Sequence, residues 1–322
     1  MSFLILIVSL VIIVISADKL IDSSSKIARH YGVPVFIIGI SIIAFGTSAP
    51  ELVVGIISSV SGDNALSYGN IIGSCINNTA LILGITAIIV TVSVSEKILK
   101  REMLMLTAVE LVLLAFSFNG TLSRIDGIIL VILGIAFICY LIKGTKSNTE
   151  SEDATSAVKL EKKEVLEKWA IMIISLCALI FSGQLIVDSS QAIAADFGIE
   201  QSAIGLTLIA LGTTMPELVT SIAAARKKEN DIILGNIIGS NIFNILIILG
   251  TAATIHPITI NFIDPVHIAD SLFVEVGIMI FINIFVYAIM AFRRKVSKFS
   301  GVLLLLIYAM YMANQICSLP TK

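Results

Sequence analysis

The chain has 322 residues, of which 57% are hydrophobic and only 14% charged, and its net charge is -2. A soluble domain carries about 25% charged residues. A chain this apolar cannot bury its hydrophobic residues in one water-exposed core, so the lipid bilayer must act as its solvent. The near-neutral charge, without a basic block, excludes a nucleic-acid-binding surface.

Apolar windows of about 20 residues are typical of membrane-spanning helices. The sequence predicts ten, at residues 2–18, 33–60, 66–91, 103–119, 124–143, 166–187, 202–225, 231–253, 267–292 and 298–317. The expected fold class is therefore an all-α membrane protein with ten transmembrane helices.

The basic residues predict how these helices are oriented. If both termini lie outside the cytoplasm, cytoplasmic loops and helix ends hold all of the 21 Lys and Arg residues except Arg124 and Lys322. Because basic residues concentrate on the cytoplasmic side of membrane proteins, this asymmetry favours extracytoplasmic termini and a location in the cell membrane.

A polar segment divides the chain into two halves. Residues 144–168 are rich in Ser, Thr, Glu and Lys and are expected to form a cytoplasmic linker. The predicted organisation is an N-terminal five-helix unit over residues 1–143, this linker, and a C-terminal five-helix unit over residues 169–322.

The two halves repeat the same motifs at an offset of 166 residues. Gly39–Val53 and Gly205–Val219 share nine of fifteen residues, and Gly69–Asn78 and Gly235–Asn244 share eight of ten. Five spans per half would force the second copy into the membrane upside down. Inverted repeats of this kind are a transporter architecture, with ions bound near the membrane midplane.

The first motif of each half places a proline and a glutamate inside an apolar span, as GTSAPE ending at Glu51 and GTTMPE ending at Glu217. Proline lacks an N–H group, so a kink is expected there, with backbone carbonyls released towards a polar cavity. An ionised carboxylate at a helix centre costs about 2.5–3.5 kcal/mol, and such acids usually mark ion pathways. Two acids brought together repel each other unless cations bind beside them. The empty, doubly charged site should therefore cross the membrane poorly, so the protein is expected to exchange ions rather than leak them.

The second motif places polar side chains four residues apart on a span rich in isoleucine. Positions four apart share one helix face, so each half has a polar stripe, formed by Asn70, Ser74 and Asn78 and by Asn236, Ser240 and Asn244. Glycines in the same motif, at positions 69, 73, 235 and 239, allow neighbouring helices to approach closely.

These paired motifs resemble the two alpha-repeats of the calcium/cation antiporter superfamily, most closely those of prokaryotic sodium/calcium exchangers. The resemblance implies that Ca²⁺ is held by Glu51, Glu217, Thr47 and Thr213. It implies Na⁺ sites built from Ser48, Ser74 and the Ala44 carbonyl on one side and from Thr214, Ser240 and the Ala210 carbonyl on the other. Asn78 and Asn244 would face each other in the middle. Asn244 stands where many relatives carry Asp, and Thr214 replaces the more usual Ser.

The expected function is therefore Na⁺/Ca²⁺ exchange by alternating access in a single chain, with no cofactor beyond the transported ions. A Ca²⁺/H⁺ antiporter of the same fold is the alternative, because two glutamates could equally carry protons. A cation channel fits the inverted repeat poorly. A membrane enzyme is disfavoured because the sequence holds no nucleophile–base set. Glu110 and Glu275, inside the fourth and ninth spans, either contribute to a peripheral ion path or lie at helix interfaces.

Overall fold

The computed structural model describes residues 2–62, 64–147, 160–196, 212–260 and 272–317. The described residues are mainly helical, as expected for apolar segments whose backbone groups must be satisfied internally in lipid. In the first half the helices are α1 (Ser2–Tyr31), α2 (Val35–Ile38), η1 (Gly39–Ile43), α3 (Ala44–Thr47), α4 (Ala49–Val60), α5 (Asn64–Ile76), η2 (Asn77–Ile82), α6 (Leu83–Ile89), η3 (Ile98–Glu102), α7 (Met103–Ser117) and α8 (Arg124–Ser147), where η marks a π-helical segment.

In the second half the described helices are α9 (Lys162–Asp196), α11 (Met215–Arg226), α12 (Asn230–Phe243), η6 (Asn244–Leu249), α13 (Gly250–Ile255), α14 (Leu272–Arg293) and α15 (Lys298–Cys317). Two antiparallel pairs of very short strands connect loops. They are β1 (Val92–Ser93) with β4 (Lys295–Val296), and β2 (Thr121–Leu122) with β3 (Ile258–Thr259).

Six helical stretches of the described residues are long and apolar enough to cross a membrane, and a seventh is added if Val35–Thr47 and Ala49–Val60, bent by 43°, form one span. The fold is thus a multi-pass helical one. Each of the ten predicted windows contains helix in its described part. The stretches over α7, α11 and α15 do not reach that criterion, so ten spans stays a prediction, as do the inverted five-helix units.

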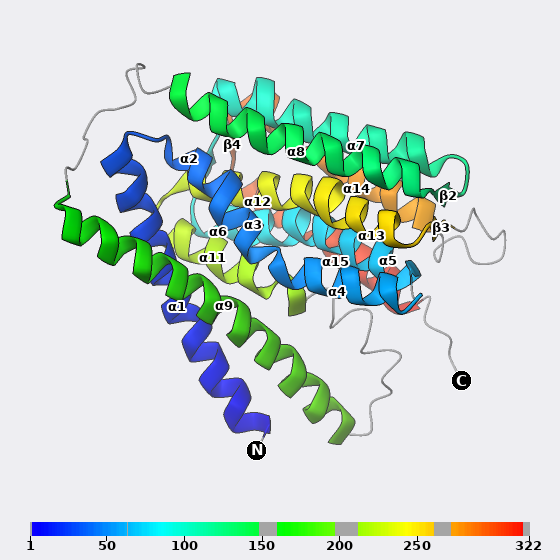
Figure 1. The fold of residues 1–322 in the computed structure, drawn as a ribbon, viewed down its shortest axis with the longest axis horizontal. Coiled ribbons are helices and arrows are strands. Elements are labelled where there is room, and N and C mark those ends of the chain that lie inside the picture. The colour runs from blue at the N-terminus through cyan, green and yellow to red at the C-terminus, as the bar shows by residue number, and fades with distance from the viewer. Residues whose placement is uncertain (1, 63, 148–159, 197–211, 261–271, 318–322) are drawn as a thin grey trace.

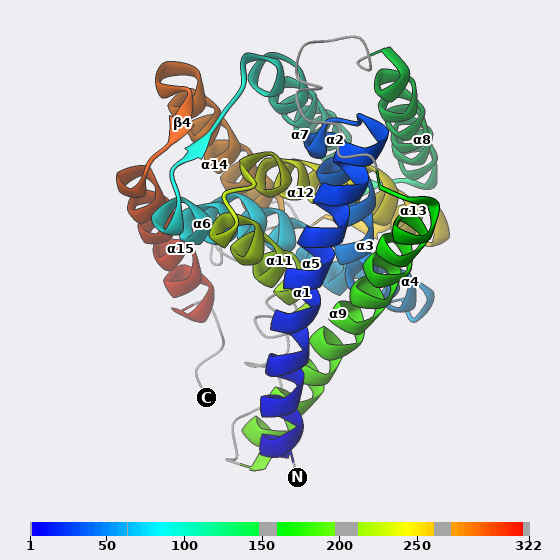
Figure 2. The same cartoon turned by 90° about the vertical axis from the view of Figure 1, so that its left-hand side faces the viewer.

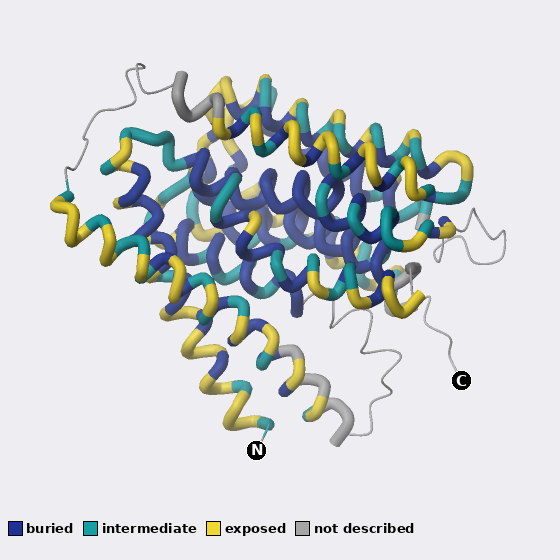
Figure 3. Tube along the Cα trace, in the orientation of Figure 1, coloured by how far each residue is buried: buried dark blue, intermediate teal, exposed yellow. Residues whose placement is uncertain are grey.

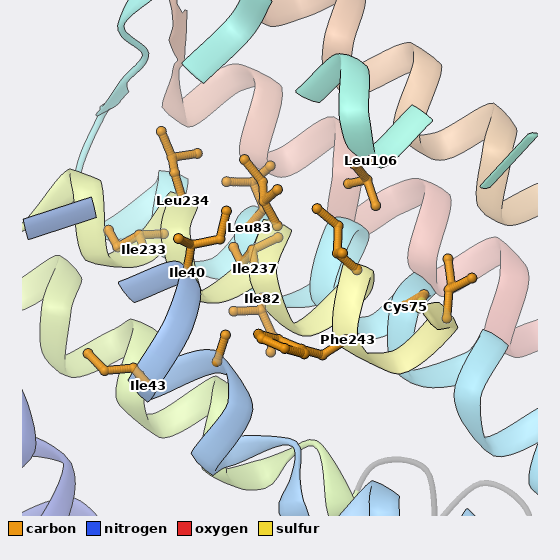
Figure 4. Close-up of a cluster of buried hydrophobic side chains, with 14 of the residues drawn as sticks. Ile40, Ile43, Cys75, Ile82, Leu83, Leu106, Ile233, Leu234, Ile237 and Phe243 are labelled. Carbon is orange, nitrogen blue, oxygen red and sulfur yellow. The ribbon is translucent and has the colours of Figure 1, made fainter. Parts of the chain in front are cut away.

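The two helical stretches that carry the second motif form the centre of the molecule. Over the stretch of α5, η2 and α6, 83% of the residues in its apolar window are buried, and over α12, η6 and α13 the share is 94%, against 28–39% for α1, α8, α9 and α14. Figure 3 shows this buried centre surrounded by helices with exposed outer faces. Figure 4 shows Ile40 of η1 beside Ile233 and Ile237 of α12, all three of them buried. The motif helices are therefore packed against each other and enclosed by the other helices.

Local structure repeats at the offset seen in the sequence. β3 begins 166 residues after β1, and the π-helical segments η2 and η6 begin at Asn77 and Asn244, near equivalent positions. The first helices of the two halves, α1 and α9, lie side by side and run in opposite directions (Figures 1 and 2). The opposite direction of these two helices is what an inverted repeat requires.

Helix α1 extends well beyond its predicted end at residue 18. Its polar C-terminal part continues as helix because Ser23, Ser24 and Ser25 are buried against neighbouring helices. Ion pairs fix the same part to the turn between α11 and α12: Lys227 Nζ lies 2.8 Å from Asp22 Oδ1, and Arg29 lies 2.9 Å from Glu229. A hydropathy window cannot detect this extension, because tertiary contacts stabilise it.

Candidate cation site

Both proline-containing motifs interrupt their helices. Ser48, between α3 and α4, leaves the helical conformation with φ -81° and ψ 9°, and Pro50 lies in the first turn of α4. Thr214 has a similar conformation, with φ -83° and ψ -2°, before Pro216 in the first turn of α11. The bend expected at the first proline is confirmed, and the second motif has the same interruption. Residues 197–211, which include Ala210, lie outside the described residues.

The interruptions place two glutamates in the interior. The exposed fraction of Glu51 is 0% and that of Glu217 is 1%. Ser48 Oγ, from the segment that carries Glu51, donates a hydrogen bond to Glu217 Oε1 at 3.0 Å. Ser74 Oγ of α5 donates to Glu51 Oε1 at 3.4 Å. The carboxylates of the two halves therefore lie in one shared cluster.

Each carboxylate keeps one oxygen without a hydrogen-bond partner among the residues that the structure describes, namely Oε2 of Glu51 and Oε2 of Glu217. When both carboxyl groups are ionised, the like charges of the two glutamates repel each other. Burying charged oxygens without partners is unfavourable. Two such oxygens in one cluster favour a bound cation.

Two equivalent hydrogen bonds join the halves around these acids. Thr47 Oγ1 donates to Asn236 Oδ1 at 3.2 Å, and Thr213 Oγ1 donates to Asn70 Oδ1 at 3.4 Å. In each pair a threonine of one half's first motif meets an asparagine of the other half's second motif. The two halves therefore make the same contact with each other twice, once through Thr47 and once through Thr213, next to the carboxylates.

Further oxygen atoms surround the acids on both sides. The Ala44 carbonyl accepts hydrogen bonds from Thr47 Oγ1 at 3.3 Å and from Ser240 Oγ at 3.5 Å. Thr214 Oγ1 donates to Ser74 Oγ at 3.3 Å. The expected grouping placed Ser74 with Ala44 and Ser240 with Thr214, whereas these hydrogen bonds join Ser240 to Ala44 and Ser74 to Thr214.

The two asparagines expected to face each other do not share a hydrogen bond. Asn78 Nδ2 donates to Asn241 Oδ1 at 3.0 Å, and Asn241 Nδ2 donates to Thr79 Oγ1 at 2.8 Å. Both amide atoms of Asn244 are buried without a hydrogen-bond partner in the described part of the chain. Asn78 is the second residue of η2 whereas Asn244 is the first of η6, so the widened π-helical turns present them differently.

Sequence reasoning missed two polar residues of this cluster. Asn241 bonds Asn78, and Asn77 Nδ2 donates to Thr214 Oγ1 at 3.5 Å. Asn241 was not predicted because the first half has Cys75 at the equivalent position. Asn77 was not predicted because it lies off the polar stripe of its helix. Their amides, in spans rich in isoleucine, were the signal that could have found both.

Glycines bring the backbones of η1 and α12 into contact. A Cβ atom added to Gly239 would lie 2.6 Å from the Ile40 carbonyl oxygen, and one added to Gly235 would lie 2.8 Å from the Ile40 nitrogen. The close approach predicted from these glycines is confirmed. It places Ser240 of α12 against the Ala44 carbonyl.

The atoms gathered here are carboxylate, hydroxyl, carbonyl and amide oxygens, which suit hard cations such as Ca²⁺ and Na⁺. Across the described ranges, no group of three or more His, Cys, Asp or Glu residues is placed to hold a metal ion. The site therefore has two acids and a shell of neutral oxygens.

Residues 1–143 and 167–317 match the family described as "Sodium/calcium exchanger protein". The chain belongs to the sodium/calcium exchanger family. It is 35% identical to the inner membrane protein YrbG of Escherichia coli over 306 residues, which cover 94% of this chain and 92% of that protein. It is 28% identical to the sodium/calcium exchanger MaX1 of Methanosarcina acetivorans, over 97% of each chain.

The fold also matches solved structures of a sodium-calcium exchanger. The sodium-calcium exchanger NCX_Mj, soaked with Na⁺ and Sr²⁺, superposes with a TM-score of 0.85 at 29% identity over 97% of each chain. Members of this family are transporters, so the chain is a membrane cation transporter of the antiporter type and not an enzyme.

Proposed function

We propose that this protein exchanges Ca²⁺ for Na⁺ across the membrane by alternating access. The observation that carries the proposal is the buried pair Glu51 and Glu217, joined through Ser48 and surrounded by neutral oxygens from both halves. Two similar proteins, MaX1 and NCX_Mj, are sodium/calcium exchangers, and this similarity supports the proposal. The empty site would be doubly negative inside the bilayer, which opposes its movement without cations.

The proposed ligand set contains neutral oxygen atoms in addition to the two carboxylates. A metal cation such as Na⁺ is bound by several oxygen ligands, as Ca²⁺ is, whereas a proton needs only one carboxylate oxygen. Neutral oxygens around the acids therefore favour Na⁺ over H⁺ as the exchanged ion. The proposed set is Glu51, Glu217, Thr47, Thr213, Ser48, Thr214, Ser74, Ser240, Asn78, Asn244 and the carbonyls of Ala44 and Ala210.

The site is completed within one chain, which supports a functional monomer in the cell membrane. The opposite directions of α1 and α9 support an inverted repeat, whose two halves exchange roles between the outward-open and inward-open states (Figure 1). The distribution of basic residues supports extracytoplasmic termini.

Exchange in liposomes tests the coupling ion. Purified protein is reconstituted into liposomes, and uptake of radioactive Ca²⁺ is followed under an outward Na⁺ gradient and then under an outward H⁺ gradient. We expect Na⁺-driven uptake well above that of protein-free liposomes. Uptake driven by H⁺ and indifferent to Na⁺ would establish the Ca²⁺/H⁺ alternative instead.

The Ser48 hydroxyl is expected to contribute directly to cation affinity. A hydrogen bond to a charged group contributes about 1.5–3 kcal/mol, so Ser48→Ala should raise the Ca²⁺ concentration for half-maximal uptake about 10- to 100-fold. Ser58→Ala is the matched control, because Ser58 lies in α4, which begins directly after Ser48, and its described hydrogen bonds go to the nearby carbonyls of Val54 and Gly55. Equal affinities in the two variants would contradict a role for Ser48 in the site.

A further inference from the structure

A further buried acid, Glu110, lies outside the proposed cation site. Glu110 of α7 has an exposed fraction of 0%, and its Oε2 accepts a hydrogen bond from Asn283 Nδ2 of α14 at 2.8 Å. Asn283 is also fully buried. Among the ion pairs of the described residues, none involves Glu110. Its carboxyl group therefore lacks a described positive partner.

The donors around Glu110 are already used. Asn283 Nδ2 donates both to Glu110 and to Thr107 Oγ1, the latter at 3.2 Å. The Thr107 hydroxyl donates to the Met103 carbonyl at 2.9 Å. In the part of the chain that the structure covers, Glu110 Oε1 and Asn283 Oδ1 are both buried acceptors without a partner. The cluster thus has an excess of acceptors and lacks one donor.

A single proton supplies that donor. A protonated carboxyl group has one O–H donor, and it removes the charge that burial disfavours. A metal cation would need several oxygen ligands, whereas this cluster offers two unpaired acceptors. The chemistry of the cluster therefore favours H⁺ as its ligand.

The cluster is close enough to the cation site to influence it. Helix α7, which carries Glu110, packs against α12 and η6, and α14, which carries Asn283, packs against α5 and η2. These four elements carry Ser240, Asn244, Ser74 and Asn78 of the proposed cation site. Leu106, one turn before Glu110, belongs to the same buried core as Cys75 (Figure 4). Glu110 thus lies on a helix that packs directly against the helices of the proposed cation site.

Other titratable groups lie on the elements that pack around Glu110. Glu275 of α14 accepts from Gln315, and Glu102 of η3 pairs with Arg101. The same elements also carry Tyr287 and Arg293 in α14, Asp231 in the first turn of α12, and Lys100 in η3. The described hydrogen bond of Glu110 is the one from Asn283, and none of these other groups shares a described hydrogen bond or ion pair with Glu110.

We propose that Glu110 and Asn283 form a proton-binding site behind the cation site, and that release of the Glu110 proton strengthens Ca²⁺ binding. Loss of the proton adds a negative charge near Glu51 and Glu217 in a medium of low dielectric constant. Coupling between two sites is reciprocal, so bound Ca²⁺ promotes release of the proton. This coupling rests on the proposed cation site, whereas protonation of Glu110 does not.

Infrared spectroscopy tests the protonation without any transport. A protonated carboxyl group has a C=O stretch separate from that of a carboxylate. We expect a band at neutral pH that disappears in Glu110→Gln and persists in Glu275→Gln, a matched change of a partly buried acid in α14. Glutamine keeps the acceptor and adds the missing donor. An identical band in wild type and Glu110→Gln would overturn the proposal.

A second variant keeps the test decisive if Glu110→Gln does not fold. Asn283→Leu removes the hydrogen bond to the carboxyl group, so the wild-type band should move to higher frequency. A band at the same position would exclude the Glu110–Asn283 pair.

Calcium binding at several pH values tests the coupling. Across the pH range in which the band disappears, the Ca²⁺ affinity of wild-type protein should increase about tenfold more than that of Glu110→Gln. The same pH dependence in both proteins would overturn the coupling. If the band behaves as expected but neither protein exchanges Ca²⁺ for Na⁺, the proton site stands and the proposed function fails.

Discussion

Glu51→Gln and Glu217→Gln are each expected to abolish Ca²⁺ transport while the protein remains folded. Each substitution keeps the shape of a buried side chain and removes half of the negative charge that attracts the cation. Changing residues that only support metal ligands costs 10–100-fold in affinity, so loss of a ligand should reduce Ca²⁺ uptake by more than about 100-fold. Uptake of radioactive Ca²⁺ into liposomes measures it.

Glu96→Gln is the matched control for these variants. Glu96 is exposed at 63% of its side chain and pairs with Lys100 on the surface, where Lys100 lowers the pKa of Glu96. It should transport at the wild-type rate. Thermal unfolding of all the variants separates loss of a ligand from loss of the fold. Near-normal flux in either Glu51→Gln or Glu217→Gln would refute the ligand assignment.

Gly239→Ala is expected to be the most damaging single-methyl change in the core. The added Cβ would lie 2.6 Å from the Ile40 carbonyl oxygen and 2.7 Å from Ala44 Cβ, so the backbones of α12 and η1 would have to separate. Overpacking of this kind costs about 1–3 kcal/mol. The separation would also move Ser240 away from the Ala44 carbonyl, and Ca²⁺ transport should be lost or strongly reduced.

Gly277→Ala is a close control for that change. Gly277 also lies in a helix, α14, but nothing described lies within 4 Å of an added Cβ. Its melting temperature and transport rate should match wild type or increase slightly, because alanine favours helix. Equal thermal stability of the two glycine variants would show that the η1–α12 contact tolerates a methyl group.

Part of the site could be predicted from the sequence because its polar residues occur in motifs that both halves repeat. Pro50 and Pro216 predicted interrupted helices, since a missing N–H group acts locally. Ser48 and Ser74 are placed in one ion site only through the family resemblance, and the structure instead bonds Ser48 to Glu217 and Ser74 to Thr214. The small residues at Gly235 and Gly239 predicted close packing because only glycine permits backbone contact.

Other features depend on contacts that a linear pattern does not contain. The π-helical segments begin at Asn77 and at Asn244, one residue out of step with the repeat, and no motif in the sequence predicts this difference. Asn241 takes part in the cluster, but the equivalent residue of the first half is Cys75. A search for polar residues shared by both halves therefore does not find Asn241. Glu110 could be located in a span from sequence, but its pairing with Asn283 depends on how α7 and α14 pack.

The long helices α1 and α9 have a further consequence for the lipid around the protein. At about 1.5 Å per residue, the 30 residues of α1 extend beyond a hydrocarbon layer that is about 30 Å thick. Figure 2 shows the two helices projecting together from the rest of the bundle, and ion pairs to Lys227 hold α1 near its polar end. Hydrophobic mismatch is relieved by tilting. A thinner bilayer therefore increases the tilt of this pair about its fixed end, which makes membrane thickness a physical input to the protein's conformation.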